Sequence, residues 1–395
     1  MPKFEIITEG ITKLYVSKGK ISKKLPVFYN PSKEFDRDLS VILLKALGKK
    51  TVLDLLAASG ARGLRLAKEA GCNIFFNDIN SEAIKLIKKN AKLNKIKPIK
   101  VTNKRADELL TSTKEKFDFI DIDPFGSPIT YVYQAITKLE KDGILAVTAT
   151  DTAPLYGVYP KTCFRKYGSY PLHVNFGHEI AIRILAKAVI EIAAKQNICI
   201  IPIFSHATQH YYRIYFQASR SYVERVLDKI GFIYFCRKCR NRFATKFLHK
   251  EKCTCGNQLE WTGPLYIGNL WDTTLVEEMM KHLNPATAVA ELTKGKTTLT
   301  QVLRGKKVPY GNVLDTVLNI NGLKNKHMQF LETVFEESKI DIPCFYETDE
   351  FGTVEPRINE VIEKLKKSGL KASRTHFSGK GIRTNADVEQ LKKCF

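Results

Sequence analysis

The sequence predicts an α/β protein built around a mostly parallel sheet that helices cover on both faces. Short apolar runs alternate with longer helical stretches from residue 51 onward, and this alternation is typical of right-handed βαβ units. It ends in two apolar runs around a short polar turn, residues 198–218, which predict a hairpin that adds an antiparallel strand. The 395 residues allow two or three domains at roughly 100–200 residues each.

The individual elements follow from local patterns in chain order. Residues 25–35 contain an aromatic pair flanked by two prolines, which predicts an extended, turn-rich arm. A helix is expected over 38–47, closed by Gly48. Parallel strands are expected at 51–57, 73–79, 98–103, 117–123 and 143–151. Helices are expected at 62–70, at 81–93 with Ser81 as the N-cap, and at about 179–195.

The closing hairpin distinguishes two enzyme classes that use this kind of sheet. An antiparallel strand added to the parallel strands is typical of the methyltransferase version, and the Rossmann dehydrogenase version lacks it. The hairpin therefore favours a methyltransferase.

A small-residue turn after the first strand predicts a nucleoside cofactor. Residues 57–63 have the form A-x-G-x-x-G, in which Gly60 allows close ligand approach and Gly63 allows close helix packing. Ser59 lies within this turn. Asp78, 18 residues beyond Gly60 at the end of the second strand, can accept hydrogen bonds from both ribose hydroxyls. Asp54, in the first strand, either faces a cationic cofactor or braces the loop.

The third strand leads into Arg105, Ala106 and Asp107, where an adenine ring would lie. Asp107 is a candidate acceptor for the adenine amino group. The alternative, an acid at a solvated helix N-terminus, is about equally favoured.

The fourth strand ends in Asp123-Pro124-Phe125, a pattern suited to methylating an exocyclic amine. Such an amine is a poor nucleophile because its lone pair is delocalised into the ring, and a fixed carboxylate that binds its N–H takes up the developing charge. Pro124 stiffens the loop so that its carbonyl can act as a second acceptor, and Phe125 offers a stacking surface for an extruded base. The alternative is an aspartate that caps the next helix.

Taken together, these motifs resemble the tRNA guanine-26 N2-dimethyltransferase family over essentially the whole chain. The matching segments are 26–31 (PVFYNP), 36–38 (DRD), 58–63 (ASGARG), 77–78 (ND), 121–128 (DIDPFGSP), 148–155 (TATDTAPL) and 374–377 (RTHF). The resemblance implies a class I, Rossmann-like methyltransferase with a seven-stranded sheet and an antiparallel closing strand. A zinc-ribbon-like segment and a smaller α+β C-terminal domain are expected to follow the sheet.

The resemblance also implies residue roles and a cofactor, S-adenosyl-L-methionine. Asp123 would be the catalytic acceptor, and Phe28 and Phe125 would hold the flipped guanine. The family's cofactor contacts match Arg37, Arg62 and Asp78. The sequence departs from the family after the third strand, where an acid followed by Ala is usual and the order here is Arg105-Ala106-Asp107. Without the resemblance, Phe28 would be an ordinary core aromatic and Arg37 a surface arginine.

A cysteine cluster predicts a structural zinc. The four thiols are paired as C-x-x-C and C-x-C, thirteen residues apart: Cys236, Cys239, Cys253 and Cys255. Two such pairs can close a tetrahedral site that organises a segment too small for its own core. Because the second pair is one residue shorter than the commoner spacing, His249 is a reserve ligand. The alternative is unlinked buried thiols.

The charge balance predicts a nucleic-acid partner, which the resemblance implies is tRNA. Lys and Arg number 63 against 41 Asp and Glu, a net charge of +22. Residues 321–395 carry a surplus of only one, so phosphate attraction should centre on residues 1–320. The first residues lack a signal-peptide core, and no apolar run suits a membrane span. We therefore expect a cytoplasmic protein without a membrane or protein partner, acting as a monomer.

Three regions are expected along the chain. Residues 1–218 form the methyltransferase domain with its N-terminal arm, 219–265 the basic zinc-ribbon-like segment, and 266–395 a C-terminal tRNA-recognition domain with helices at 297–307 and 357–370. Two other functions are open: a non-catalytic, zinc-containing RNA-binding protein on the same fold, and a nicotinamide-dependent oxidoreductase. The intact Asp123 loop argues against the first, and the hairpin and that loop argue against the second.

Overall fold

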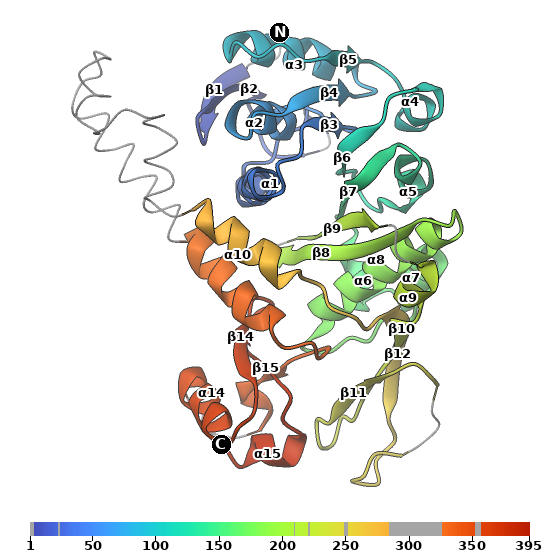
Figure 1. The fold of residues 1–395 in the computed structure, drawn as a ribbon, viewed down its shortest axis with the longest axis vertical. Helices are drawn as coiled ribbons and strands as arrows, with labels where there is room; N and C mark the ends of the chain where they lie inside the picture. The colour runs from blue at the N-terminus through green and yellow to red at the C-terminus, as the bar shows by residue number, and fades with distance from the viewer. Residues whose placement is uncertain are drawn as a thin grey trace, which may run out of the picture.

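A seven-stranded sheet lies at the centre of the upper half of the molecule (Figure 1). The computed structural model describes residues 4–22, 24–208, 210–219, 222–248, 252–283, 326–351 and 357–395. The strand order is β5-β4-β3-β6-β7-β9-β8, in which β9 alone runs antiparallel to both of its neighbours. This is the predicted parallel sheet closed by the predicted hairpin.

The sheet strands begin close to the expected positions. They are β3 (Thr51–Asp54), β4 (Asn73–Asn77), β5 (Lys100–Thr102), β6 (Phe117–Ile122), β7 (Leu139–Ala149), β8 (Cys199–Thr208) and β9 (Tyr211–Ser219). The middle strands are buried on both faces, which explains their continuous apolar runs. Because β3, β4 and β6 are parallel neighbours, the loops that follow them meet at one edge of the sheet.

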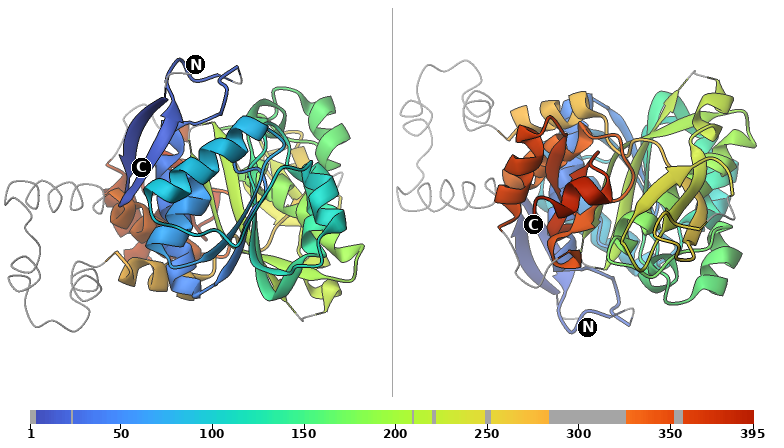
Figure 2. Two further views of the ribbon diagram at one scale, coloured as in Figure 1. Left: turned by 90° about the horizontal axis from the view of Figure 1, so that it is seen from above. Right: turned by 90° about the horizontal axis from the view of Figure 1, so that it is seen from below.

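Helices cover both faces of the sheet (Figure 2). The helices before and within the sheet are α1 (Glu34–Leu47), α2 (Ala61–Glu69), α3 (Ser81–Leu93), α4 (Ala106–Ser112) and α5 (Ile129–Ile136). The helices after β7 are α6 (Thr152–Tyr156), α7 (Pro160–Tyr167), α8 (Gly177–Ala194) and α9 (Val223–Leu227). Gly48 closes α1 in the left-handed region, as predicted. The prediction that Ser81 caps α3 is wrong: the N-cap is Asn80, whose side chain accepts the Glu82 N–H.

The N-terminal arm contains more structure than the sequence predicted. Strands β1 (Phe4–Glu9) and β2 (Thr12–Ser17) form an antiparallel hairpin that packs against α3. Asn90 on α3 exchanges hydrogen bonds with the main chain of Tyr15, and Asn94 does the same with Lys13. The short 3-10 helix η1 (Pro31–Lys33) then leads directly into α1.

Two smaller three-stranded sheets follow the seven-stranded sheet. The first has the order β11-β10-β12, from β11 (Arg242–Thr245), β10 (Ile230–Phe235) and β12 (Glu260–Tyr266). The second has the order β13-β15-β14, from β13 (Tyr346–Glu347), β15 (Ser378–Thr384) and β14 (Ala372–Thr375). It packs with α14 (Ile358–Lys367), which confirms the α+β prediction for the C-terminal part. The remaining elements are α10 (Thr273–Lys281), a helix over 326–338, η2 (Thr348–Glu350) and α15 (Val388–Lys392).

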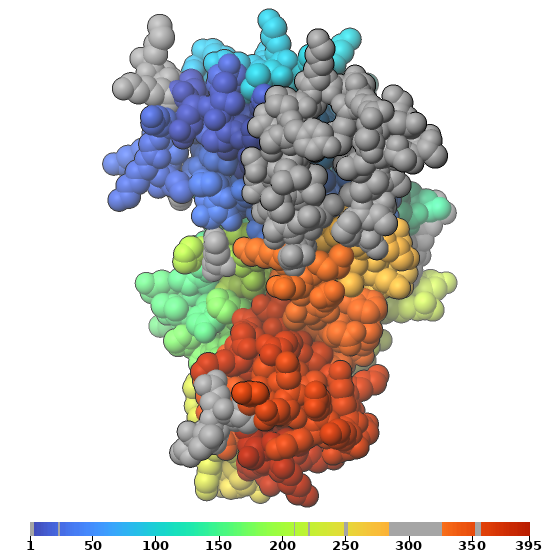
Figure 3. Space-filling model, turned by 90° about the vertical axis from the view of Figure 1, so that its left-hand side faces the viewer, coloured from blue at the N-terminus to red at the C-terminus, as the bar shows by residue number. Residues whose placement is uncertain are grey.

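The C-terminal residues lie at the end of the molecule opposite the N-terminal arm (Figure 3). One large apolar cluster runs from Leu14 through the sheet to Phe345, and a second gathers residues from Tyr346 to Cys394. The boundaries predicted at 218/219 and 265/266 stay predictions, and the helix expected at 297–307 lies outside the described residues. Within the described ranges, no helix has both the length and the apolarity needed to cross a bilayer.

Candidate active site

The turn between β3 and α2 has the backbone that a close ligand needs. Gly60 has φ +75°, and a Cβ there would lie 2.9 Å from Ile87. A Cβ at Gly63 would lie 2.3 Å from the Phe76 ring, so glycine lets α2 pack directly on β4. Ala58 has φ 46°, which is rare for a residue with a side chain. Close packing against Ile87 and Phe76 therefore requires glycine at positions 60 and 63 and fixes the turn in one conformation.

Two predicted carboxylates hold this turn in place. Asp78 accepts the N–H groups of Ala58, at 2.7 Å, and of Asn80, at 2.8 Å. Burial outweighs these hydrogen bonds and raises the pKa of Asp78. Asp54 accepts the Gly63 N–H at 3.1 Å, so it braces the loop, which was one of its two predicted roles. Burial, together with the nearby Asp121 carboxylate, raises the pKa of Asp54.

The residues after β5 occupy a different environment. Ala106 is buried at the first position of α4. Asp107 is exposed, and its two carboxylate oxygens each lie 3.1 Å from the Arg105 guanidinium. The hydrogen bond from Arg105 lowers the pKa of Asp107. A contact between Asp107 and adenine stays a prediction.

Asp123 follows the end of β6 and is held by two cations. Its Oδ1 lies 2.5 Å from Lys33 Nζ, and its Oδ2 lies 3.0 Å from an Arg62 terminal nitrogen. Burial would raise the pKa of Asp123, but the charges of Lys33 and Arg62 outweigh it and lower the pKa. The side chain keeps 18% of its surface exposed. Asp123 is therefore an ionised carboxylate that a ligand can reach.

A buried layer of charges lies beneath Asp123. Arg62 contacts Asp36 at 2.5 Å and Asp121 at 2.9 Å in addition to Asp123. Arg213 on β9 contacts the other oxygen of Asp121 at 2.5 Å. Burial would raise the pKa of Asp36, but Arg62 and Arg213 hold it well below its usual range. Arg62 was predicted as a cofactor contact; in the structure its guanidinium is surrounded by these carboxylates, and the cofactor contact stays a prediction.

The two predicted aromatic residues lie together beside Asp123. The Phe28 and Phe125 rings are 4.7 Å apart between centroids and meet edge to face at 79°. Phe125 is 51% exposed, which is unusual for a large apolar side chain. The loop is braced by Thr150, whose Oγ1 accepts the Gly126 N–H at 2.6 Å and lies 3.5 Å from the carbonyl oxygen of buried Pro124.

Two other predicted site residues are buried and bound by neighbouring groups of the protein. Ser59 is buried, and its carbonyl accepts a hydrogen bond from the Asn90 amide. Arg37 is also buried and forms a two-pronged ion pair with Glu9 at 2.5 and 2.7 Å. Arg37 also donates a hydrogen bond to the Asn30 carbonyl at 3.1 Å. A role for Arg37 in cofactor binding stays a prediction.

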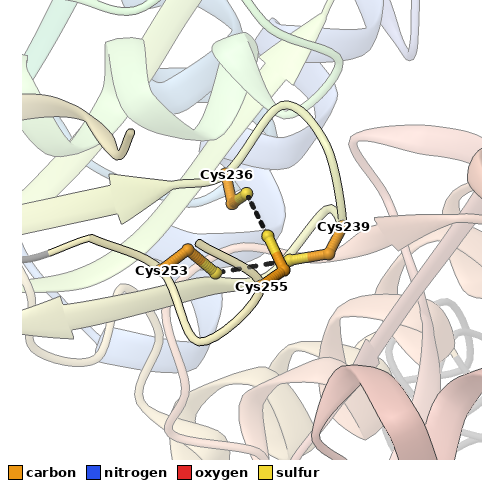
Figure 4. A group of neighbouring side chains, drawn as sticks. All are labelled: Cys236, Cys239, Cys253 and Cys255. Atoms are coloured by element: carbon orange, nitrogen blue, oxygen red, sulfur yellow. Dashed lines mark hydrogen bonds between the residues drawn. The ribbon is translucent and has the colours of Figure 1, made fainter. Parts of the chain in front are cut away.

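The four predicted cysteines converge (Figure 4). Their sulfur atoms all lie within 4.8 Å of one another, with Cys236–Cys255 at 3.5 Å and Cys239–Cys253 at 3.4 Å. They come from the turn after β10 and the loop before β12, and they belong to a small apolar cluster. His249, the reserve ligand, lies outside the described residues.

A comparison with protein-family models gives one assignment for the whole chain. The model of "N2,N2-dimethylguanosine tRNA methyltransferase" matches residues 3–307 and 306–395. The chain belongs to this family.

Similar proteins agree with this assignment. A tRNA (guanine(26)-N(2)/guanine(27)-N(2))-dimethyltransferase of Aquifex aeolicus is 34% identical, covering 98% of this chain and 95% of its own length. A tRNA (guanine(26)-N(2))-dimethyltransferase of Methanocaldococcus jannaschii is 35% identical, with 98% and 97% covered. The solved structure of Trm1 from Pyrococcus horikoshii with S-adenosyl-L-methionine matches with a TM-score of 0.80 and 30% identity, covering 99% of both chains.

For this family member, sequence reasoning missed several residues that surround Asp123. Lys33 was not singled out, because its partner is 90 residues away in the chain. Arg213 is 92 residues from Asp121 and lies inside a strand that appeared wholly apolar. Asp36 and Thr150 belonged to matched segments, but nothing local indicated what they contact. One lysine in a segment predicted to be a turn-rich arm offers no pattern from which its role could have been found.

Proposed function

We propose that the protein transfers methyl groups from S-adenosyl-L-methionine to the N2 amine of guanine 26 in tRNA, forming N2-methyl- and then N2,N2-dimethylguanosine. The observation that carries this proposal is the ionised Asp123 beside an exposed aromatic ring at the carboxyl edge of the sheet. The names of the relatives support both the substrate and the modified position. Family membership argues against the non-catalytic RNA-binding alternative.

The turn after β3 suits the cofactor. Gly60 adds no side chain to the turn, and half-buried Asp78 keeps lone pairs for ribose hydroxyls after accepting two main-chain N–H groups. Ser59, Arg37, Asp54, Ala106 and Asp107 complete the proposed cofactor contacts. When bound, S-adenosyl-L-methionine supplies an electrophilic methyl group and leaves as S-adenosylhomocysteine, with the bonding electron pair kept on sulfur.

The chain's own residues act on the base. Phe28 and Phe125 stack against the extruded guanine, which must leave its helix to be reached. Asp123 accepts a hydrogen bond from N2–H and so stabilises the positive charge that develops on the nitrogen as the new N–C bond forms. Asp123 then takes the released proton. A carboxylate of low pKa suffices for this step, because a methylated arylammonium is a strong acid.

The cysteine cluster suits a structural zinc. A tetrahedral site with Zn–S bonds of about 2.3 Å places its sulfur atoms about 3.8 Å apart, close to the separations of the four thiols. We propose that zinc holds the turn after β10 to the loop before β12. Basic side chains around this site, among them Lys238 and Arg240, would meet tRNA phosphates. The tRNA substrate implies a cytoplasmic location.

The decisive experiment measures methyl transfer to unmodified tRNA. Purified protein with labelled S-adenosyl-L-methionine should yield both methylated products, with mass spectrometry mapping positions 26 and 27. We expect Asp123→Ala to lower the transfer rate by about a hundred- to ten-thousand-fold while cofactor binding persists. As a control, Asp228→Ala removes a largely exposed carboxylate of the same charge. Equal transfer by the Asp123 variant and the wild type would contradict the proposed role.

A further inference from the structure

Lys33 has an environment that a solvent-facing lysine would not need. It is the last residue of η1, and its side chain is only 12% exposed. Its ammonium lies 2.5 Å from Asp123 Oδ1 and 5.2 Å from the centre of the Tyr211 ring. Tyr211 is itself 4% exposed and begins β9. Lys33 is therefore fixed from two sides, next to the proposed catalytic carboxylate.

The position of the Lys33 ammonium relative to the Asp123 carboxylate suits the binding of guanine. The Watson–Crick edge of guanine carries N2–H and N1–H as donors and O6 as an acceptor, with N1 between the other two. When N2–H and N1–H both face the Asp123 carboxylate, O6 lies on the N1 side of it. When N1–H faces Oδ1, a donor beside Oδ1 reaches O6, and Lys33 supplies that donor. Arg62, beside Oδ2, already contacts Asp36 and Asp121.

The lone-pair count allows this arrangement. Each carboxylate oxygen has about two acceptor sites. Oδ1 uses one for Lys33 and Oδ2 uses one for Arg62. One site remains on each oxygen for the two N–H groups of guanine, and an ammonium has three donors, so Lys33 can bind Oδ1 and O6 together.

We propose that Lys33 is a specificity-determining residue that donates a hydrogen bond to O6 of the target guanine. This inference rests on the proposed function, because it assumes that guanine N2 meets Asp123. It assigns Lys33 a role on the substrate in addition to its ion pair. Adenine, with a 6-amino donor and no 2-amino group, would place a donor against the ammonium and leave the two remaining acceptor sites of the Asp123 carboxylate unused, which a site built for hydrogen bonds rejects.

The test uses the full-length enzyme and two tRNAs that differ only at position 26. One carries guanine, and the other carries 2-aminopurine, which keeps the reactive 2-amino group but lacks O6 and N1–H. The wild type should prefer the guanine tRNA by about 100-fold or more in kcat/KM, because two hydrogen bonds to charged groups are lost and each contributes about 10-fold or more. We expect Lys33→Met to lower kcat/KM on the guanine tRNA and to reduce the preference by about 10- to 100-fold.

Control variants separate this role from simpler ones. Lys33→Arg keeps a donor and should retain more of the preference than Lys33→Met. Lys20→Met removes the same charge from an exposed position of the same arm and should leave the preference unchanged. Cofactor binding checks that each variant is folded.

Two results would overturn the inference. Lys33→Met could lower kcat/KM by the same factor on both tRNAs, which means that Lys33 serves only Asp123. The wild type could use both tRNAs equally, a result that needs no variant. Failure of the wild type to methylate the guanine tRNA would instead refute the proposed function, so the two failures are distinguishable.

Discussion

Arg383 on β15 joins three parts of the chain through a fully buried guanidinium. One terminal nitrogen lies 2.6 Å from Glu179 on α8 and 2.9 Å from Glu337 on the helix over 326–338. The other donates to two main-chain carbonyls in the segment before β13. All three charged side chains are 0% exposed. Arg383→Met keeps the apolar stem and removes the shared cation, so it tests how strongly the C-terminal sheet is attached to α8.

The remaining contacts set the size of the expected effect. Removing one partner of a buried ion pair costs about 3–5 kcal/mol, because it leaves an uncompensated charge. Glu179 would keep Arg183 at 2.8 Å, and Glu337 would keep His376 at 2.7 Å. Neither carboxylate would be left without a partner. We therefore expect Arg383→Met to lower the free energy of unfolding by about 3 kcal/mol, the lower end of that range.

Urea unfolding followed by tryptophan fluorescence is a suitable assay, because buried Trp271 lies 5.4 Å from the Arg383 guanidinium. Adding Glu337→Gln to Arg383→Met removes the one negative charge that Arg383 no longer balances and should restore about 1–2 kcal/mol. Lys380→Met, on the same strand but half exposed, should change the free energy of unfolding by less than about 1 kcal/mol. A change below about 1 kcal/mol for Arg383→Met would refute the argument from buried charge.

Two further predictions concern pH and metal. Burial would raise the pKa of Glu337, but His376 and Arg383 outweigh it and lower the pKa to about 2. Because the pKa in the unfolded chain is about 4.3, this carboxylate should stabilise the fold above about pH 5 and lose that contribution as the pH falls toward 2. The urea concentration at the unfolding midpoint should therefore fall less steeply with decreasing pH in Glu337→Gln than in the wild type. Equal slopes in the two proteins would contradict the prediction. A chelator should release about one zinc per chain and increase hydrogen exchange in residues 236–258, while cofactor binding persists. A metal content in Cys236→Ser equal to that of the wild type would contradict the zinc assignment.

The sheet could be predicted from the sequence because its determinants are local. Each central strand is buried on both faces, so it appears as a short apolar run between turn residues. The first residues of β7, 139–142, were missed because a single leucine is followed there by three charged residues, which do not resemble a buried strand. The β1–β2 hairpin was missed for a different reason. Its main chain is held by Asn90 and Asn94 of a helix more than 70 residues away, and no local pattern records such a partner.

In the candidate site too, residues in local motifs were predicted, and residues whose role depends on distant partners were missed. Motif residues such as Asp123 and Gly60 were predicted because they follow strands whose ends meet at one edge of a parallel sheet. The choice between Ser81 and Asn80 as the cap of α3 failed because both residue types cap helices well and they are neighbours in the chain. Lys33 could not be predicted, since its importance comes entirely from a carboxylate on a distant strand.

The position of Arg62 explains why the proposed cofactor turn and the proposed catalytic carboxylate form one structure. Arg62 lies on α2 directly after the turn, yet its guanidinium contacts Asp36, Asp121 and Asp123. These carboxylates come from α1, from β6 and from the loop after β6, so a single planar group fixes their relative positions. A lysine would be a poor substitute, because one compact ammonium cannot present separated donors to three carboxylates. Part of the electrostatic environment that keeps Asp123 ionised, the Arg62 charge, thus comes from the helix that begins at the proposed cofactor site, and Lys33 on η1 supplies another part.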